Sequence, residues 1–288
     1  MADSSLVTKV SNIFEKSLNN GFLTFISSVE ERIRINKINY QIRCIPSLKK
    51  KQNNLDKGQE VPKKKFNPFL PYDENLFVQK TPNNFHNILL NKFSVIKYHI
   101  LLTTVDFQSQ LDPLNAHDLE SMWWTLNSIE KGNYKELAFF NCGADSGASQ
   151  PHKHLQILAI DKGVEDMPPV NDIIIEEGQK FEKGKIFKIS QYKLNHGCIL
   201  FPKDERITPE NLLNYYNDLL SIVPSGSSYN FLCTLDWMLV VPRSKETYNE
   251  RISINSLGFA GMVLVKSNED IDLIKEVGVE NIINSLGY

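Results

Sequence analysis

The spacing of apolar side chains predicts both helices and strands in the first half of the chain. Apolar residues recur at helical spacing between Leu6 and Leu18, whereas residues 38–44 alternate apolar and polar side chains as a half-buried strand does. Residues 98–105 show little polar alternation and suit a strand that is covered on both faces. Helical spacing returns over residues 115–130, so helices and strands are mixed along the chain.

The same spacing predicts a second lobe. Short apolar runs at 137–140 and 154–160 predict further strands of the first lobe, and the polar, irregular stretch 161–186 is interpreted as the boundary. The elements expected beyond it are strands near 196–202, 229–233, 237–242 and 259–266 and helices near 209–222 and 269–286. We therefore assign the chain to the α+β class, with regions 1–165 and 185–288 forming one compact, bilobed unit.

Composition and charge limit the classes of function. The 288 residues are 41% hydrophobic and 23% charged, which excludes a disordered chain or a coiled coil. Lys and Arg number 32 against 34 Asp and Glu, a net charge of -2, so no overall field attracts nucleic acid or an anionic membrane. Any anion that this protein binds must therefore be bound by local groups.

The cysteine spacing, the start of the chain and the lengths of its apolar runs bear on where in the cell the protein is expected. The four cysteines are far apart in the sequence, which gives neither a zinc knuckle nor a disulfide scaffold. No signal peptide is recognised at Met1, and no apolar run approaches the length of a membrane span. We expect a reduced, soluble protein in the cytoplasm, with the nucleus as an additional location.

A lysine-rich segment separates the first predicted strand from the next apolar runs. Residues 49–65 contain seven lysines and almost no apolar side chains, which is typical of a solvated surface loop. A lysine at either end of this loop could still reach a bound phosphate. The sequence leaves both interpretations open.

The most informative segment runs from Asn141 to Ile157. Its first part contains Gly143 and Gly147 among small residues, a composition in which consecutive backbone N–H groups can point at one anion. Its second part reads His152-Lys153-His154-Leu155-Gln156 and enters a predicted strand. The period of two places His152, His154 and Gln156 on one face and Lys153 on the other, so replacing Lys153 with Ala is expected to do little.

Three interpretations of the two histidines compete. They could be metal ligands, although no third ligand is near in sequence and Gln is a poor one. They could be exposed residues of a strand. One imidazole could instead be a nucleophile toward phosphorus, which requires a neutral ring, a fixed tautomer and donors for the non-bridging oxygens. The adjoining loop, with Ser149 and Gln150, supplies such donors and favours the nucleophile.

The segment Ser149-Gln150-Pro151-His152-Lys153-His154-Leu155-Gln156 resembles the active-site signature of the transferase branch of the histidine-triad superfamily. It is similar in particular to that of the fungal ATP adenylyltransferases, also called diadenosine tetraphosphate (Ap4A) phosphorylases. The resemblance continues in the same order along the chain, at 46–48, 90–93, 237–244 and 255–266. It implies a mixed or antiparallel sheet with flanking helices, in which the N-terminal region carries the motif and the C-terminal region completes the nucleotide site.

The resemblance also implies a reaction and a set of site residues. The reaction is reversible phosphorolysis of Ap4A by phosphate to ATP and ADP through AMP on a histidine, with phosphorolysis of adenylyl sulfate as a side activity. By position in the motif, His154 is the nucleophile, His152 maintains the geometry and Gln156 contacts the α-phosphate. The positions implied to contact nucleotide are Lys51, Asn91, Lys92, Asn141, Gly147, Ala148, Ser149, Gln150, Gln156, Asn255, Ser256, Leu257, Met262 and Lys266.

Expectations about ligands follow from the same resemblance. We expect small nucleotides and phosphate as ligands, a divalent cation of the Mg²⁺ type travelling with the polyphosphate, no tightly bound cofactor, no nucleic acid or membrane partner, and a monomer. A dinucleoside polyphosphate hydrolase and a non-catalytic nucleotide-binding protein stay open as alternatives. The hydrolase branch has a histidine where this chain has Gln156. An amide cannot give up a proton, which favours a phosphate acceptor over water.

The remaining histidines are given structural interpretations. His86, His117 and His196 are predicted to lie at the surface, and His99, inside an apolar strand, is predicted to be a buried core histidine. Cys142, inside the glycine loop, has no adjacent cation to stabilise a thiolate and is predicted to be a small packing residue.

Overall fold

A computed structural model of the chain describes residues 5–45, 67–131, 134–163 and 168–288. Its helices are α1 (Leu6–Asn19), α3 (Ala116–Glu130), α4 (Asn171–Gly178), α5 (Pro209–Leu220), α6 (Ser256–Phe259), α7 (Asn268–Val277) and α8 (Val279–Asn284), with a 3-10 turn η1 (Ala144–Ser146). The strands up to the sequence motif are β1 (Thr24–Phe25), β2 (Val29–Ile35), β3 (Ile38–Cys44), β4 (Phe77–Lys80), β5 (His86–Leu90), β6 (Phe93–Ser94), β7 (His99–Thr104) and β8 (Tyr134–Cys142). The later strands are β9 (His154–Asp161), β10 (Ile186–Phe187), β11 (Gly197–Leu200), β12 (Ser228–Cys233), β13 (Trp237–Arg243), β14 (Thr247–Tyr248), β15 (Ile252–Ser253) and β16 (Met262–Val265).

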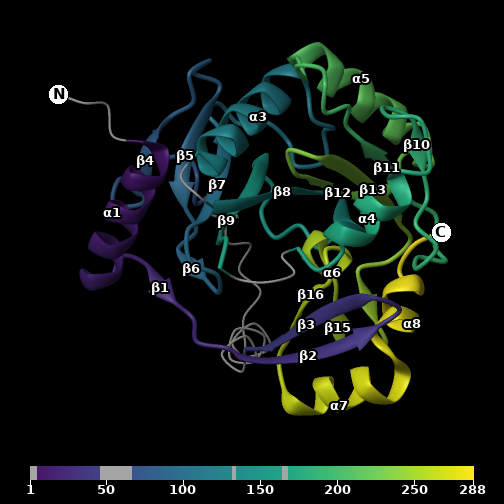
Figure 1. Cartoon of the computed structure of the whole chain (residues 1–288). Coiled ribbons are helices and arrows are strands. Elements are labelled where there is room, and N and C mark those ends of the chain that lie inside the picture. Colours follow the sequence, from purple (N-terminus) through teal and green to yellow (C-terminus); the bar gives the residue numbers. More distant parts are fainter. Residues whose placement is uncertain (1–4, 46–66, 132–133, 164–167) are drawn as a thin grey trace.

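Nine strands form one sheet through the middle of the molecule (Figure 1). Their order is β10-β11-β13-β12-β8-β9-β7-β5-β4, and every pairing is antiparallel. The sheet passes from the first predicted region into the second where β8 pairs with β12. A smaller sheet, β16-β3-β2, lies below it in Figure 1. The predicted α+β class is confirmed.

Each face of the large sheet is covered by its own hydrophobic core. On one face α1, α3 and α5 contribute buried side chains such as Phe14, Leu126 and Tyr216. On the other face the covering elements are the small sheet with α4, α7 and α8. Because both faces are covered, inner strands such as β7 are buried along their whole length, as the run of apolar residues at 98–105 predicted.

The structure corrects two predicted elements. The stretch 161–186 is not irregular throughout, because Ile173 and Ile174 give α4 an apolar face that is buried against the sheet. The helix expected at 269–286 is two helices, since Gly278 adopts a φ of +88° between α7 and α8 and ends the first of them. The other predicted helices and strands are present with small shifts of their ends.

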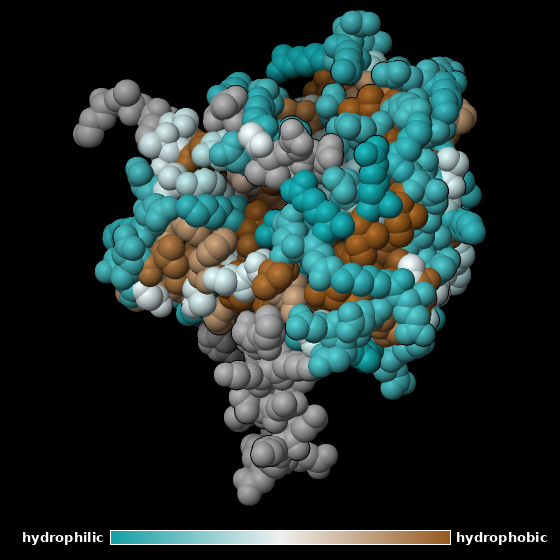
Figure 2. Space-filling model, turned by 60° about the horizontal axis from the view of Figure 1, so that its bottom comes forward, coloured by the Kyte–Doolittle hydropathy of each residue, from teal (hydrophilic) through white to brown (hydrophobic). Residues whose placement is uncertain are grey.

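Hydrophobic side chains also reach the surface. Figure 2 shows them in patches among hydrophilic residues, including one on the side where β1 and β6 lie. Phe25 and Phe93, on that pair of strands, are 37% and 45% exposed. No helix in the described parts of the chain is both long and apolar enough to cross a membrane.

Candidate active site

The motif runs into β9, which begins at His154 and lies in the centre of the large sheet between β7 and β8. Thr103 of β7 pairs with His154, and Phe139 of β8 pairs with Gln156. Alternate residues of β9 enter opposite cores, with Leu158 on one face and Leu155 on the other. The alternation places His154 and Gln156 on the face of Leu158, as the period of two predicted.

His154 has a defined tautomer. Its Nδ1 lies 2.9 Å from the carbonyl oxygen of His152. Because a carbonyl only accepts, Nδ1 carries the proton, and Nε2 of the neutral ring keeps its lone pair. The pKa of His154 is lowered to about 4, mainly by burial and also by the neighbouring His152, while the backbone hydrogen bond to His152 raises it. The ring is therefore neutral near pH 7, which is the state that a nucleophile needs.

His152 is held by groups from two other segments. The Asn67 amide nitrogen lies 3.0 Å from Nδ1 of His152, while Nε2 lies 2.9 Å from both the carbonyl and the hydroxyl oxygen of Thr104. Since the amide nitrogen donates to Nδ1, Nε2 carries the proton and donates to the Thr104 carbonyl. The Phe69 ring packs against both histidine rings. These contacts fix His152 as a rigid support beneath His154.

The glycine loop before the motif forms a cradle of backbone donors. Gly143 and Gly147 have φ angles of +90° and +80°, on either side of η1. Among the described residues, the backbone N–H groups of Ala148, Ser149 and Gln150 have no protein acceptor. Free N–H groups in a turn of this kind bind anions, so the loop can receive a phosphate.

A buried polar network ties this loop to the C-terminal region. The Asn141 side-chain oxygen accepts from the backbone N–H of Ser256 at 3.0 Å and from its hydroxyl at 2.7 Å. The Asn230 amide donates to Asn141 and to the carbonyl of Ser146. Arg243, fully buried, donates to Asn230 and to the backbone carbonyl of Ile254. Asn141 and Ser256 therefore hold the two halves of the site together from behind.

Three adjoining cavities surround the motif. The first, of about 770 Å³, is lined by six of the predicted residues, namely Asn91, Lys92, Ser149, Gln150, His154 and Gln156. The second, of about 490 Å³, is largely apolar and shares Asn91, Phe93, Ser149 and Gln156 with the first. Leu257 lies on its wall. The third, of about 240 Å³, is lined by the predicted residues Gly147, Asn255, Met262 and Lys266.

The structure brings most of the predicted residues together. His152, Asn141 and Ser256 are buried and act from behind the cavities, while Ala148 belongs to the loop between Gly147 and Ser149. Lys51 and the rest of the lysine-rich segment lie outside the described residues. Supporting residues that the sequence analysis did not identify come from distant segments and have no motif of their own. They are Asn67, Phe69, Thr104, Asn230 and Arg243.

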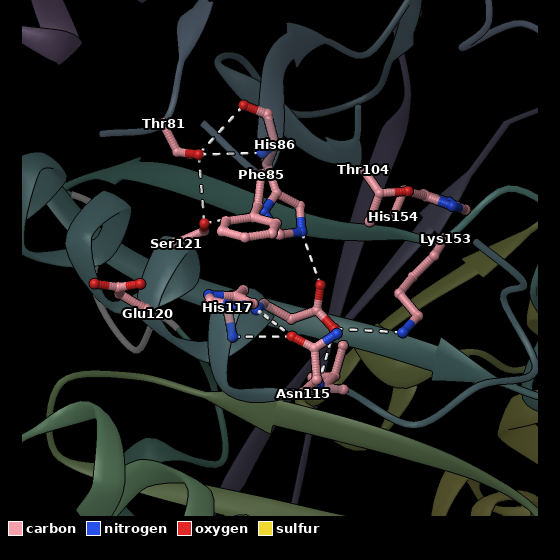
Figure 3. A network of polar contacts seen from close by, with 12 residues as sticks. Thr81, Phe85, His86, Thr104, Asn115, His117, Glu120, Ser121, Lys153 and His154 are labelled. Carbon is pink, nitrogen blue, oxygen red and sulfur yellow. Dashed lines mark hydrogen bonds and ion pairs between the residues drawn. The ribbon is translucent and has the colours of Figure 1, made fainter. Parts of the chain in front are cut away.

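Lys153 points away from His154, as predicted, but it enters a buried ionic network (Figure 3). Its Nζ lies 3.4 Å from Oδ2 of Asp118, whose Oδ1 lies 2.8 Å from Nε2 of His86. The Asp118 pKa is lowered: burial alone would raise it, but the hydrogen bond and charge of His86 and the charge of Lys153 outweigh burial. The prediction of a surface position for His86 was therefore wrong, because Asp118 and Ser121 satisfy its ring inside the core.

The other structural interpretations have mixed outcomes. His196 is fully buried, not at the surface, because Leu194 and Ile189 satisfy both ring nitrogens through their backbone. His117 is exposed, as predicted. Cys142 is buried, and burial raises its pKa to about 11, which fits a packing residue. His99 is buried as predicted, but its Nε2 lies 3.0 Å from Oε1 of Gln156, at the active site.

The side chains around the motif do not form a metal centre. Within the described ranges, no group of three His, Cys, Asp or Glu side chains could hold a metal ion. The ring nitrogens of His152 and Nδ1 of His154 are all used in hydrogen bonds to protein groups. The arrangement suits nucleophilic attack on phosphorus better than metal binding.

Comparisons with known proteins find a family and several relatives that this chain resembles over most of its length. Residues 1–176 match the family model of the Ap4A phosphorylase N-terminal domain, and residues 187–288 match that of the ATP adenylyltransferase C-terminal domain. Protein APA1 of Saccharomyces cerevisiae is 29% identical over 299 residues, covering 95% of this chain and 90% of the relative. Diadenosine 5',5'''-P1,P4-tetraphosphate phosphorylase 2 of the same yeast is 29% identical over 304 residues, covering 96% and 92%. The crystal structure of yeast Ap4A phosphorylase Apa2 in complex with Ap4A is similar with a TM-score of 0.85 and 26% identity, covering 100% of this chain and 99% of that one.

Proposed function

The chain belongs to the Ap4A phosphorylase family, and from that premise we propose that it is a nucleotidyltransferase that converts Ap4A and phosphate reversibly into ATP and ADP. The observation that carries the proposal is the tautomer of His154. Its Nδ1 proton is committed to the carbonyl of His152, which leaves the Nε2 lone pair for phosphorus. The ring lines a cavity together with loop residues that offer free N–H groups.

The chemistry proceeds in two displacements at one phosphorus. In the first, Nε2 of His154 forms a bond to the α-phosphorus of one AMP unit, and the bond from that phosphorus to the bridging oxygen breaks, so that ATP leaves. In the second, an oxygen of inorganic phosphate attacks the same phosphorus, the P–N bond breaks, and ADP leaves. We assign to the N–H groups of Ala148, Ser149 and Gln150 the stabilisation of the charge that develops on the non-bridging oxygens in both steps.

The paired cavities suit a substrate with two nucleosides. The cavity that His154 lines and the apolar cavity beside it meet at Asn91, Phe93, Ser149 and Gln156. We assign the transferred AMP to the first cavity and the leaving ATP to the adjoining ones. Phe93, 45% exposed where the two cavities meet, offers an apolar face to a base.

Hydrolysis is the closest alternative, and Gln156 argues against it. Its amide can donate a hydrogen bond but cannot exchange a proton with a leaving group or with water. Product analysis separates the two functions, because transfer gives ATP and ADP only when phosphate is present. A nucleotide-binding protein without chemistry would bind Ap4A and give no product under either condition.

Further aspects extend the proposal. We infer that a divalent cation of the Mg²⁺ type enters with the polyphosphate as part of the substrate. Adenylyl sulfate is a second donor in this proposal, since it offers the same AMP phosphorus with sulfate as the leaving group. We also propose that the protein acts as a monomer and in the cytoplasm.

Mass spectrometry of the protein mixed with Ap4A and no phosphate tests the central step. We expect an added mass of AMP on the peptide that contains His154, and its loss when phosphate is supplied. His154→Ala should show no adduct, whereas His117→Ala, which removes an exposed histidine on α3, should behave as the wild type. An adduct on another residue, or none on the active wild-type protein, would contradict the proposal.

A further inference from the structure

His99 links two residues of the site and also lines the apolar cavity beside the motif. Its Nε2 lies 3.0 Å from Oε1 of Gln156, and its Nδ1 lies 3.1 Å from the amide nitrogen of Asn91. The three side chains come from β7, β9 and the connection after β5. The His99 side chain is buried, with 8% of its surface exposed, and packs beside the Phe139 ring.

The direction of both hydrogen bonds of the His99 ring follows from the groups that they join. The Asn91 side-chain oxygen accepts from the backbone N–H of Phe93, which leaves its amide nitrogen facing His99. An amide nitrogen only donates, so Nδ1 of His99 accepts and the ring proton lies on Nε2. That proton is donated to Oε1 of Gln156. The NH₂ group of Gln156 is thereby turned away from His99.

The same device holds His152. The Asn67 side-chain oxygen accepts from the backbone N–H of Phe69, and its amide nitrogen faces Nδ1 of His152. In both cases the side-chain oxygen of an asparagine accepts from the backbone N–H two residues later, and its amide nitrogen donates to the histidine. This donor sets which ring nitrogen of the buried histidine carries the proton. His152 supports the nucleophile in this way, and His99 has the corresponding place beneath Gln156.

We propose that His99 is a positioning residue, which fixes the Gln156 amide so that its NH₂ group, and not its carbonyl oxygen, faces the phosphoryl group that is transferred. A glutamine without this constraint can rotate its amide by half a turn and present an acceptor to an anionic oxygen, which repels it. The pKa of His99 is lowered to about 4, mainly by burial and also by the neighbouring His154, while the Gln156 hydrogen bond raises it. The ring therefore remains neutral and in one tautomer near pH 7.

The catalytic effect of this inference rests on the proposed function. The tautomer of His99 can be tested without it. Long-range ¹H–¹⁵N NMR spectra of the protein without nucleotide report which nitrogen of His99 carries the proton. We expect protonated Nε2 and unprotonated Nδ1. A proton on Nδ1 would overturn the inference whether or not the protein is an Ap4A phosphorylase.

A double-mutant cycle tests the coupling to Gln156. His99→Phe keeps the ring shape without the donor, and we expect kcat to fall about tenfold, the worth of one good hydrogen bond, with little change in KM. His99→Gln restores a donor at the same place and should recover most of kcat. In a Gln156→Ala background, His99→Phe should change kcat by less than about twofold.

The cycle distinguishes positioning from plain packing. If His99 only filled the core, His99→Phe would lower kcat by the same factor in both backgrounds, and His99→Gln would not restore it. Either result would overturn the inference. A wild-type protein that forms no AMP adduct and no ATP would instead overturn the proposed function, and the NMR result would still decide the orientation of Gln156.

Discussion

The carbonyl oxygen of His152 accepts a hydrogen bond from Nδ1 of His154 at 2.9 Å. The backbone of one motif histidine thus sets the tautomer of the next. The consequence is a division of roles that the identical side chains do not reveal, since His152 uses both of its ring nitrogens for support and His154 keeps Nε2 free. A change that moves the backbone at residue 152 should therefore affect the nucleophile directly.

The low pKa of two buried histidines predicts a pH dependence. Burial lowers the pKa of His154 and of His99 to about 4, from an ordinary value of 6.5. The unfolded chain binds more protons than the folded one between these values, so stability rises with pH in this window and is lost as pH falls from 6.5 toward 4. Each histidine contributes at most roughly 3 kcal/mol to that loss.

Urea denaturation at a series of pH values measures this loss of stability. The His99→Phe variant should show a shallower dependence between pH 6.5 and 4, since one of the groups that titrate in this window is absent. The rate of AMP transfer in single-turnover experiments should stay nearly constant down to about pH 5, because His154 remains neutral there. A rate that falls with an apparent pKa near 6.5 would show that His154 is not buried in the way described.

Gly147→Ala should damage the phosphate cradle. Gly147 has a φ of +80°, and a Cβ there would lie 2.9 Å from Cβ of Asn255. The loop would have to move, and we expect kcat/KM to fall at least about tenfold. Gly226→Ala is a matched control, because Gly226 has a φ of +76° and open space around a Cβ. It should share the backbone strain and keep wild-type activity. Equal kinetic losses in both variants would point to general strain instead of the cradle.

Lys153→Met should destabilise the protein although Lys153 faces away from the substrate. Removing the ammonium leaves the carboxylate of Asp118 buried with less compensation, at a cost of about 3–5 kcal/mol. Lys162→Met is the control, since Lys162 follows the same strand but pairs with Glu130 at the surface. Its cost should stay within about 0.5 kcal/mol. Denaturant unfolding of both variants checks the difference, and a Lys153→Met protein as stable as the control would be incompatible with the network.

Chelation of divalent cations should affect turnover and not folding. Within the described ranges there is no cluster of metal-binding side chains, so the cation is expected to bind through the substrate phosphates. Addition of EDTA should lower the rate of Ap4A phosphorolysis and leave the Tm of the protein without nucleotide unchanged. A lowered Tm would indicate a structural metal site in the protein.

Local pattern was sufficient to orient the motif. The alternation along β9 requires His154 and Gln156 to share a face, because successive side chains of a strand point in opposite directions, and Lys153 points away from His154. Gly143 and Gly147 among small residues likewise indicated a turn with free N–H groups, and both have the positive φ angles that such a turn needs. Resemblance of the motif to a known family then identified the chemistry.

Only the tertiary structure determined what lies around these residues. His86 and His196 sit in polar sequence surroundings, yet partners from α3 and from their own loops bury them. Asn67 and Thr104 hold His152 from 85 and 48 residues away, and His99 reaches Gln156 across 57. Hydrophobic periodicity depends on neighbours within one element and so it can be read from the sequence. Hydrogen-bond partners of a buried ring depend on how distant elements pack, and the sequence carries no local signal for that packing.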